Sequence, residues 1–245
     1  STNPPDRPPA PQNASFELDR EQLHRSLLSA VSHDLKTPLA CIIGSLEIYE
    51  RSKDQLPPDK QNILINTALQ EAYRLDSLLT SILEMARLES GAVQVNKQPY
   101  DMELLLQDCQ AMLGHRLSGC DIRIRPVSGA FPITTDPVLL ARAICLILDN
   151  SARHGQAHPV INVAYERSGD QVLIRIQDNG PGVPESRLEA IFAKYARFAP
   201  LGGAHSGIGL GLPICREIMA LLGGAVMAAI PANGAGAVFT LSFPA

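Results

Sequence analysis

The sequence has 245 residues, enough for one large domain or two smaller ones. It is 45% hydrophobic and 19% charged, as in an ordinary globular protein, and its net charge of −4 argues against a nucleic-acid-binding protein. The five cysteines form no CxxC pair, so neither a disulfide framework nor a zinc site is expected. No apolar run reaches the roughly 18 residues of a membrane helix, so we expect no membrane segment in this chain.

The N-terminal stretch is rich in proline. Residues 1–13, STNPPDRPPAPQN, cannot bury a core, and we interpret residues 1–15 as a disordered or extended linker. A linker implies a further module before it, so we expect this chain to be part of a larger protein.

Residues 16–90 predict a helical hairpin. From about Phe16 to Arg51, and again after the proline-containing turn SKDQLPPD, apolar residues recur at steps of three or four. The second run ends at Gly91, a residue that suits a helix C-terminus. Each apolar stripe is too wide for one partner helix to cover, so we expect two hairpins to pair as a four-helix bundle in a homodimer.

Residues 91–245 change to a mixed α/β pattern. Strands are expected at 93–96, 121–127 and 131–136, a hairpin at 159–178, and two strands at the C-terminus; helices are expected at 101–113, 137–153 and 209–222. Helices on one face of a mixed sheet give a two-layer α/β sandwich. The predicted fold class is therefore a helical hairpin followed by this sandwich.

The segment SHDLKTPLA places polar residues and a proline inside the first helix. At about 100° per residue, His33 points away from the apolar stripe, and Thr37 lies on the same face one turn later. Asp34 can orient the proton on one ring nitrogen and leave the other nitrogen as a nucleophile. Pro38 has no N–H, so a kink is expected near it. A solvated surface histidine is the alternative reading of this segment.

Four later segments contain candidate nucleotide contacts. LDNSARHG places Asn150 and Arg153 near a helix end, where Asn150 can ligate Mg²⁺ and Arg153 can pair with phosphate. DNGPGVP places Asp178 at the end of a strand, where its carboxylate can accept a hydrogen bond from adenine. SGIGLGLPI leads into a helix whose N–H groups suit phosphate, and IFAKYARFAPLGGAHSG can form a lid. Each segment alone also fits an ordinary helix end, turn or surface loop.

In this order, the segments resemble the catalytic core of the sensor histidine kinases of two-component systems. SHDLKTPLA resembles their phospho-acceptor box, LDNSARHG their Asn box, IFAKYARF their Phe box, and DNGPGVP and GIGLGLPI their two glycine boxes. The resemblance runs from about Phe16 to the C-terminus. It implies a dimerisation and phosphotransfer domain at 16–90 and, at 91–245, the Bergerat-type ATP-binding sandwich shared with gyrase-type and Hsp90-type ATPases.

The resemblance also implies roles for individual residues. His33 would accept the γ-phosphoryl group of ATP, Asp34 would orient and deprotonate it, and Thr37 would serve dephosphorylation of the partner regulator. The implied nucleotide-binding residues are Asn150 (which also holds Mg²⁺), Arg153, His154, Asp178, Gly180, Gly182, Phe192, Phe198, Gly207, Gly209 and Gly211. One departure is Leu146, which stands where the family often has a second Asn and which cannot ligate a metal.

The function implied is ATP-dependent autophosphorylation of His33, followed by phosphoryl transfer to an aspartate of a response regulator receiver domain, with phosphatase activity toward that regulator. ATP and Mg²⁺ are the expected cofactors. The expected location is cytoplasmic, as the cytoplasmic portion of an inner-membrane sensor. Two other readings remain open. One is an ATPase or protein-serine kinase built on the same sandwich, and the other is a non-catalytic dimeric scaffold that docks a regulator.

Overall fold

The computed structural model describes residues 12–125, 131–194, 209–232 and 234–245, with side chains from Ser32 onward except His115. The chain forms two compact units, Ser1–Leu78 and Leu79–Ala245. Helix α2 continues from the first unit into the second, so its last turns belong to the α/β unit.

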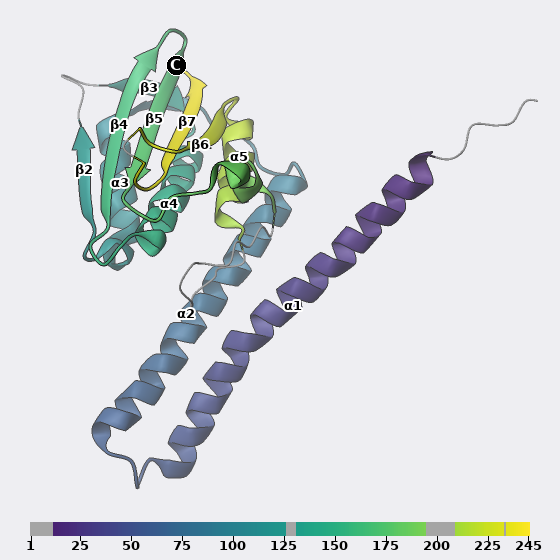
Figure 1. Ribbon diagram of the computed structural model, residues 1–245, viewed down its shortest axis with the longest axis vertical. Coiled ribbons are helices and arrows are strands. Elements are labelled where there is room, and N and C mark those ends of the chain that lie inside the picture. Colours follow the sequence, from purple (N-terminus) through teal and green to yellow (C-terminus); the bar gives the residue numbers. More distant parts are fainter. Residues whose placement is uncertain (1–11, 126–130, 195–208, 233) are drawn as a thin grey trace, which may run out of the picture. The chain divides into compact units, whose positions relative to one another are not determined.

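The first unit is a helical hairpin. Helix α1 (Gln12–Ser52) begins four residues before Phe16, and residues 53–57 connect it to α2 (Pro58–Glu89), which runs antiparallel to it (Figure 1). Pro58 is the first helical residue of α2, where a missing N–H costs no hydrogen bond. The Gln61 side chain closes the connection by donating to the carbonyls of Lys53 and Leu56, at 2.7 and 2.9 Å. The helical hairpin expected from the sequence is confirmed.

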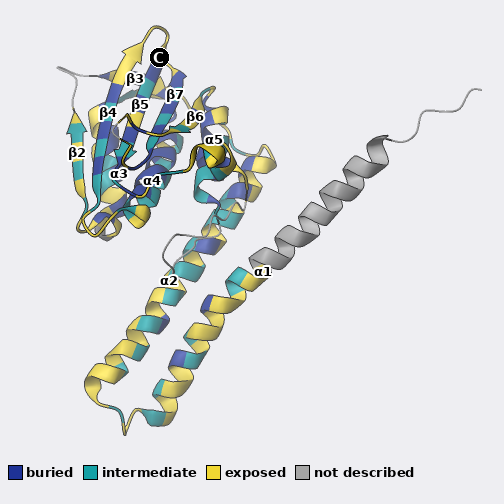
Figure 2. Cartoon of the chain, viewed as in Figure 1, coloured by how far each residue is buried: buried dark blue, intermediate teal, exposed yellow. Residues whose placement is uncertain are grey.

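Large apolar side chains remain exposed along both helices of the hairpin. Figure 2 shows exposed residues over most of the part of the hairpin whose burial is described. The exposed apolar residues are Leu39, Ile43, Leu46, Ile48, Ile63, Ile65, Leu69 and Tyr73. A single hairpin therefore leaves part of its apolar surface uncovered.

The second unit is built on a mixed sheet with the strand order β2-β4-β5-β7-β6. Its strands are β2 (Asp121–Arg125), β4 (Val160–Ser168), β5 (Gln171–Asp178), β6 (Ala225–Ala229) and β7 (Val238–Pro244). Among the described strand pairs of this sheet, β2–β4 is parallel and the others are antiparallel. A separate ribbon pairs β1 (Gln98–Asp101) with β3 (Pro132–Thr135).

Helices α3 (Met102–Leu113), α4 (Pro137–His154) and α5 (Gly211–Leu221) form a layer over one face of this sheet (Figure 1). Short 3-10 turns occur at Gly114–Leu117, Glu185–Arg187 and Ala190–Phe192. Alternate residues of the central strands, such as Ile161, Ile174 and Leu241, are fully buried beneath the helices. The two-layer sandwich expected from the sequence is confirmed.

Two aspartates position the helices that build the core. Asp101 caps α3 through the N–H groups of Glu103 and Leu104, and Asp136 caps α4. The second oxygen of the Asp136 carboxylate accepts the N–H of Asn96 at 2.9 Å. This capping carboxylate therefore also fixes the segment that follows α2.

Among the described residues of the second unit, two expected boundaries differ from the structure by two residues or more. Residues 93–96 do not form a strand, because the Asn96 N–H is engaged by Asp136, and the strand begins instead at Gln98. Helix α5 begins at Gly211 and not at Gly209, because Gly209 has a φ of +71°, which a right-handed helix does not accept. Within the described ranges, no helix combines the length and apolarity needed to cross a bilayer.

Candidate active site

The first candidate group is the His33–Asp34 pair on α1. The His33 side chain is 80% exposed and that of Asp34 is 12% exposed, with His33 Nδ1 3.6 Å from Asp34 Oδ1. A carboxylate at Nδ1 favours the tautomer whose proton lies on that nitrogen, and Nε2 then keeps its lone pair. The exposed imidazole therefore has the arrangement of a nucleophile with an orienting base.

Thr37 lies one turn after His33 and is exposed. Its hydroxyl donates to the backbone carbonyl of His33 at 3.1 Å. The next residue, Pro38, lies inside α1, and the helix continues past it to Ser52. The structure thus places His33 and Asp34 side by side, and Thr37 one turn later, on one continuous helix.

The second candidate group lies at the end of α4. Asn150 is half-buried, whereas Arg153 and His154 are exposed. Arg153 Nε donates to Asp149 Oδ2 at 2.9 Å, which holds the guanidinium beside the helix. An amide oxygen can ligate Mg²⁺ and a guanidinium can pair with phosphate, so this helix end has groups for both.

Asp178 ends β5 and is only 6% exposed. Its Oδ1 accepts the backbone N–H groups of Gly180 and Ala237 at 2.9 and 3.1 Å, and its Oδ2 accepts the Ser151 hydroxyl at 3.2 Å. The carboxylate is therefore fixed by donors from three segments, and it can accept a further hydrogen bond from a ligand amine.

The glycines after Asp178 allow close backbone approach. A Cβ at Gly180 would lie 2.8 Å from the His154 carbonyl oxygen, and a Cβ at Gly182, whose φ is +77°, would lie 2.7 Å from that of Gly236. At Gly236, with a φ of +83°, a Cβ would overlap the backbone carbonyl of Asp178. Only glycine fits these positions, and together they hold the turn after β5 against α4 and the start of β7.

Phe192 is buried, with its ring 6.5 Å from that of Phe239 and the Arg216 guanidinium 4.5 Å above it. It thus anchors the start of the segment expected to form a lid. Phe198 and Gly207, two of the expected site residues, lie outside the described residues. The remaining glycines, Gly209 and Gly211, are half-buried at the entry to α5.

Leu146 lies on α4 one turn before Asn150. Its Cδ2 is 3.8 Å from the position that a Cβ would take at Gly211. The leucine therefore packs against the N-terminus of α5, and it places an aliphatic side chain between the two segments expected to bind metal and phosphate.

The sequence pattern does not reveal the partners of Asp178. Ser151 is fully buried beside the candidate metal ligand Asn150, and its position within LDNSARHG was the only available signal. Ala237 and Gly236 come from the distant segment ANGAGAV, whose glycines resemble those of any turn. Their role depends on the β5–β7 pairing, which the chain pattern alone does not specify.

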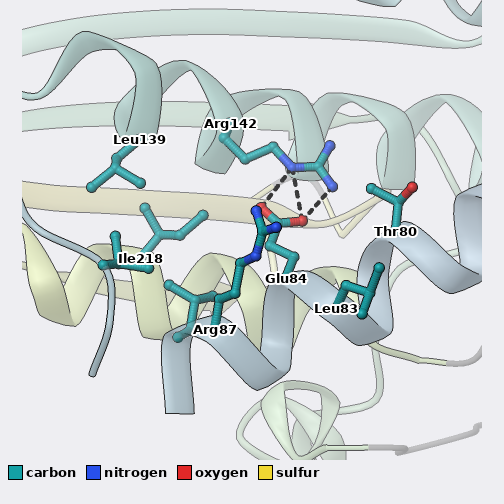
Figure 3. Close-up of a pocket in the computed structure, with 9 residues that line it drawn as sticks. Thr80, Leu83, Glu84, Arg87, Leu139, Arg142 and Ile218 are labelled. Atoms are coloured by element: carbon teal, nitrogen blue, oxygen red, sulfur yellow. Dashed lines mark hydrogen bonds and ion pairs between the residues drawn. The ribbon is translucent and has the colours of Figure 1, made fainter. Parts of the chain in front are cut away.

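A separate pocket of about 380 Å³ lies in the second unit, between the last turns of α2 and helices α4 and α5 (Figure 3). Arg142 Nε lies 2.9 and 3.1 Å from the two carboxylate oxygens of Glu84, and Arg142 Nη2 lies 2.6 Å from Oε2. These hydrogen bonds raise the pKa of Arg142 above its ordinary value. Most of the remaining lining is apolar, with Leu83, Leu139 and Ile218 among it, while Thr80 and Arg87 add polar groups.

Two family models match this chain. The His Kinase A (phospho-acceptor) domain matches residues 23–91, and the histidine kinase-, DNA gyrase B- and HSP90-like ATPase matches residues 135–245. The first model contains the His33 segment, and the second contains α4, Asp178 and the glycine-rich turns.

Similar proteins include sensor kinases. Sensor protein KdpD of Escherichia coli K12 is 31% identical over 240 residues, covering 95% of this chain and 26% of KdpD. Sensor protein VanS of Enterococcus faecium is 30% identical over 214 residues, covering 85% of this chain and 54% of VanS. The chain thus spans about a quarter to a half of the length of these relatives.

Solved structures of histidine kinases share the fold. Acinetobacter baumannii histidine kinase AdeS matches with a TM-score of 0.67 and 18% identity, over 86% of this chain and 97% of AdeS. Histidine kinase ThkA, solved in complex with response regulator protein TrrA, also matches with a TM-score of 0.67, at 19% identity, over 95% of this chain and 66% of that chain. At these identities, the likeness is evidence for the fold.

The two models define a phospho-acceptor domain followed by an ATPase domain of the gyrase and HSP90 type. The chain belongs to the sensor histidine kinases of two-component systems, and it comprises their catalytic core. The family expected from the sequence is confirmed.

Proposed function

We propose that this chain transfers the γ-phosphoryl group of ATP to His33 and then to an aspartate of a response regulator. The observation that carries the proposal is the exposed His33 imidazole with the Asp34 carboxylate at Nδ1. In the reaction, the Nε2 lone pair forms a bond to the γ-phosphorus, and the bond from that phosphorus to the β–γ bridging oxygen breaks. ADP leaves with those electrons, while Asp34 holds the proton on Nδ1 and stabilises the positive charge that develops on the ring.

In the second unit, Asp178 is proposed to accept the adenine amine, with Gly180 and Gly182 giving the base room. Arg153, His154 and the glycines at the entry to α5 are proposed to lie along the phosphates. These are the groups that phosphoryl transfer needs, because its catalysis rests mainly on positioning and charge neutralisation.

Asn150 is the proposed Mg²⁺ ligand. The described residues contain no cluster of three or more His, Cys, Asp or Glu able to hold a metal. One amide oxygen with phosphate oxygens and water suits Mg²⁺, which keeps several waters and binds along with its nucleotide. When bound, Mg²⁺ would neutralise charge on the phosphates.

The exposed apolar side chains of the hairpin support a homodimer. Leu39, Ile43 and Leu46 on α1 are each 46–49% exposed, although they belong to a helix with a regular apolar spacing. A second hairpin would cover this surface and complete a four-helix bundle.

The partner proposed for this chain is a receiver domain with a phosphorylatable aspartate. The fold match to a kinase solved with a response regulator supports this partner. Thr37 is proposed to orient the water that hydrolyses the phosphorylated regulator. Its hydroxyl would rotate away from the His33 carbonyl to do so. Thr37→Ala should therefore lose phosphatase activity and keep autophosphorylation, whereas equal loss of both activities would contradict this role.

We also propose that this core works in the cytoplasm, as part of a membrane sensor. ATP is available there, and the described cysteines, several of which are buried, are all free thiols, as a reducing compartment favours.

The test is incubation with γ-labelled ATP and Mg²⁺. The expected product is a labelled protein whose phosphate is acid-labile and base-stable, with no label in His33→Gln. The exposed His158→Gln is the control and should label normally. Acid-stable label would support a serine kinase instead, and absence of label in the wild type would support the non-catalytic scaffold.

A further inference from the structure

The Asp178 carboxylate is supported unequally on its two oxygens. Oδ1 accepts two backbone N–H groups, from Gly180 and Ala237. Oδ2 accepts the hydroxyl of Ser151, the one side-chain donor to Asp178 among the hydrogen bonds of the described residues. Since each carboxylate oxygen has about two acceptor sites, Oδ1 is saturated and Oδ2 retains one. A ligand amine is therefore expected to bind at Oδ2, the oxygen that Ser151 holds.

Ser151 is placed to act on that oxygen. It is fully buried in α4, immediately after Asn150, so water does not compete for its hydroxyl. A hydroxyl that donates to a buried carboxylate forms a charge-assisted hydrogen bond, which is stronger than a bond between neutral groups. The present O···O distance of 3.2 Å is longer than the roughly 2.5–3.0 Å of an ordinary O–H···O bond, so the contact has room to shorten when a ligand fills the site.

We propose that Ser151 is a positioning residue for recognition of the adenine 6-amine. It fixes the Asp178 carboxylate so that the remaining acceptor site of Oδ2 meets the amine of the base. This inference rests on the proposed role of Asp178 in binding adenine. Ser151 is also the neighbour of Asn150 in α4. The residue that positions the base-binding carboxylate therefore lies on the same helix as the proposed metal ligand.

The experiment compares two nucleotides in equilibrium binding to the whole chain with Mg²⁺. One is ATP, and the other is purine riboside triphosphate, which has hydrogen in place of the 6-amine. We expect the wild type to prefer ATP by about tenfold, because loss of the amine leaves a buried carboxylate site unfilled. In Ser151→Ala the preference should fall to about threefold or less, through weaker ATP binding and unchanged binding of the analogue.

Cys145→Ala is the matched control. It shortens another buried side chain of α4, one that donates to the Cys109 carbonyl and not to Asp178. This variant should keep the tenfold preference of the wild type. Ser151→Cys keeps a side chain of similar size with a weaker donor, so it should give an intermediate preference, and it serves if Ser151→Ala does not fold.

The outcomes separate this inference from the proposed function. A wild type that binds both nucleotides equally would overturn the role of Asp178 itself. A wild type that discriminates, together with Ser151 variants that discriminate equally well, would overturn the role of Ser151 alone. Equal weakening of both nucleotides in the Ser151 variants would also overturn it, since that pattern indicates a purely structural residue.

Discussion

Glu84 and Arg142 form a bidentate ion pair, in which Arg142 contacts both oxygens of the Glu84 carboxylate. Glu84 lies near the end of α2 and Arg142 in the middle of α4. Their side chains are only 22% and 31% exposed. Bidentate geometry and partial burial make this pair stronger than an ordinary surface ion pair. It fastens the last turns of α2 to the helix that carries Asn150.

Glu84→Gln should therefore loosen the end of α2. We expect the free energy of unfolding to fall by about 1–3 kcal/mol, because the guanidinium loses its charged partner while it stays half-buried. Amide exchange should rise most at residues 79–89. Glu166→Gln, which breaks the exposed ion pair with Arg175, is the comparison and should cost under about 1 kcal/mol. Equal effects of the two substitutions would contradict this account.

Gly236→Ala should damage the nucleotide site more than Gly234→Ala. Both glycines have positive φ, at +83° and +70°. A Cβ at Gly236 would overlap the Asp178 carbonyl, whereas a Cβ at Gly234 would meet no described atom within 4 Å other than those of its chain neighbours. We expect about 1–2 kcal/mol of backbone strain for Gly234→Ala, and at least twice that, together with weaker ATP binding, for Gly236→Ala. Chemical denaturation and nucleotide titration measure the two effects.

Leu146→Asn should increase the affinity for Mg·ATP. An asparagine there would add an amide oxygen one turn before Asn150, close to the N-terminus of α5. The expected gain is about threefold to tenfold, which corresponds to one net polar contact. Titration of Mg²⁺ at fixed nucleotide concentration provides the measurement, with Leu146→Met as the apolar control. Unchanged affinity in Leu146→Asn would show that position 146 lies outside the metal environment.

The free energy of unfolding of the second unit should depend on pH through the ionisation of Cys215. Burial raises the pKa of this thiol from 9.0 to about 12, so the folded state favours its neutral form. The corresponding stability is fully present below pH 9 and is lost as the pH rises toward 12. Between pH 8 and 10, the wild type should lose about 1 kcal/mol more stability than Cys215→Ala. Parallel pH profiles for the two proteins would refute the assignment.

Pro38→Ala tests whether Pro38 acts as a hinge that lets α1 bend between a geometry for kinase activity and one for phosphatase activity. Pro38 has no N–H for the Asp34 carbonyl, so the helix is expected to bend more easily beside His33 than an uninterrupted helix would. Alanine restores that hydrogen bond, and we expect a shifted ratio of kinase to phosphatase activity. A normal ratio, measured on the same dimer preparation with labelled phosphate, would count against the hinge.

The fold was largely predictable, because its main elements have strong local signals. The regular spacing of apolar residues predicts both helices of the helical hairpin. The alternation of apolar and polar residues around the SGD turn predicts the β4–β5 hairpin at nearly its observed bounds. In the one expected strand that is absent, a distant partner overrides the local pattern. Residues 93–96 alternate like a strand, but the Asp136 carboxylate, which lies 40 residues away, binds the Asn96 N–H.

The candidate site was predictable only in part, for the same reason. Residue types revealed His33 and Asp178, because a histidine beside a carboxylate and an aspartate before glycines suggest chemistry by themselves. Ser151 and Ala237 carry no such signal, since a serine in a helix and an alanine near a strand are common. They acquire a role only when β7 pairs with β5 and α4 packs over the sheet.

Lys194 belongs to the start of the segment expected to form a lid, and its ammonium lies 2.6 Å from Glu89 at the end of α2 and 3.5 Å from Glu217 in α5. These ion pairs raise the pKa of Lys194, with the hydrogen bond to Glu89 as the largest cause. The Lys194 ammonium thus pairs with both α2, which continues from the helical hairpin, and α5, which follows the glycine-rich segment. Thermodynamic linkage makes such an arrangement reciprocal. Any change in the last turn of α2 that alters nucleotide affinity must be matched by an equal effect of bound nucleotide on that turn. A signal that reaches this turn through α2 and a nucleotide bound in the second unit would therefore shift the same conformational equilibrium.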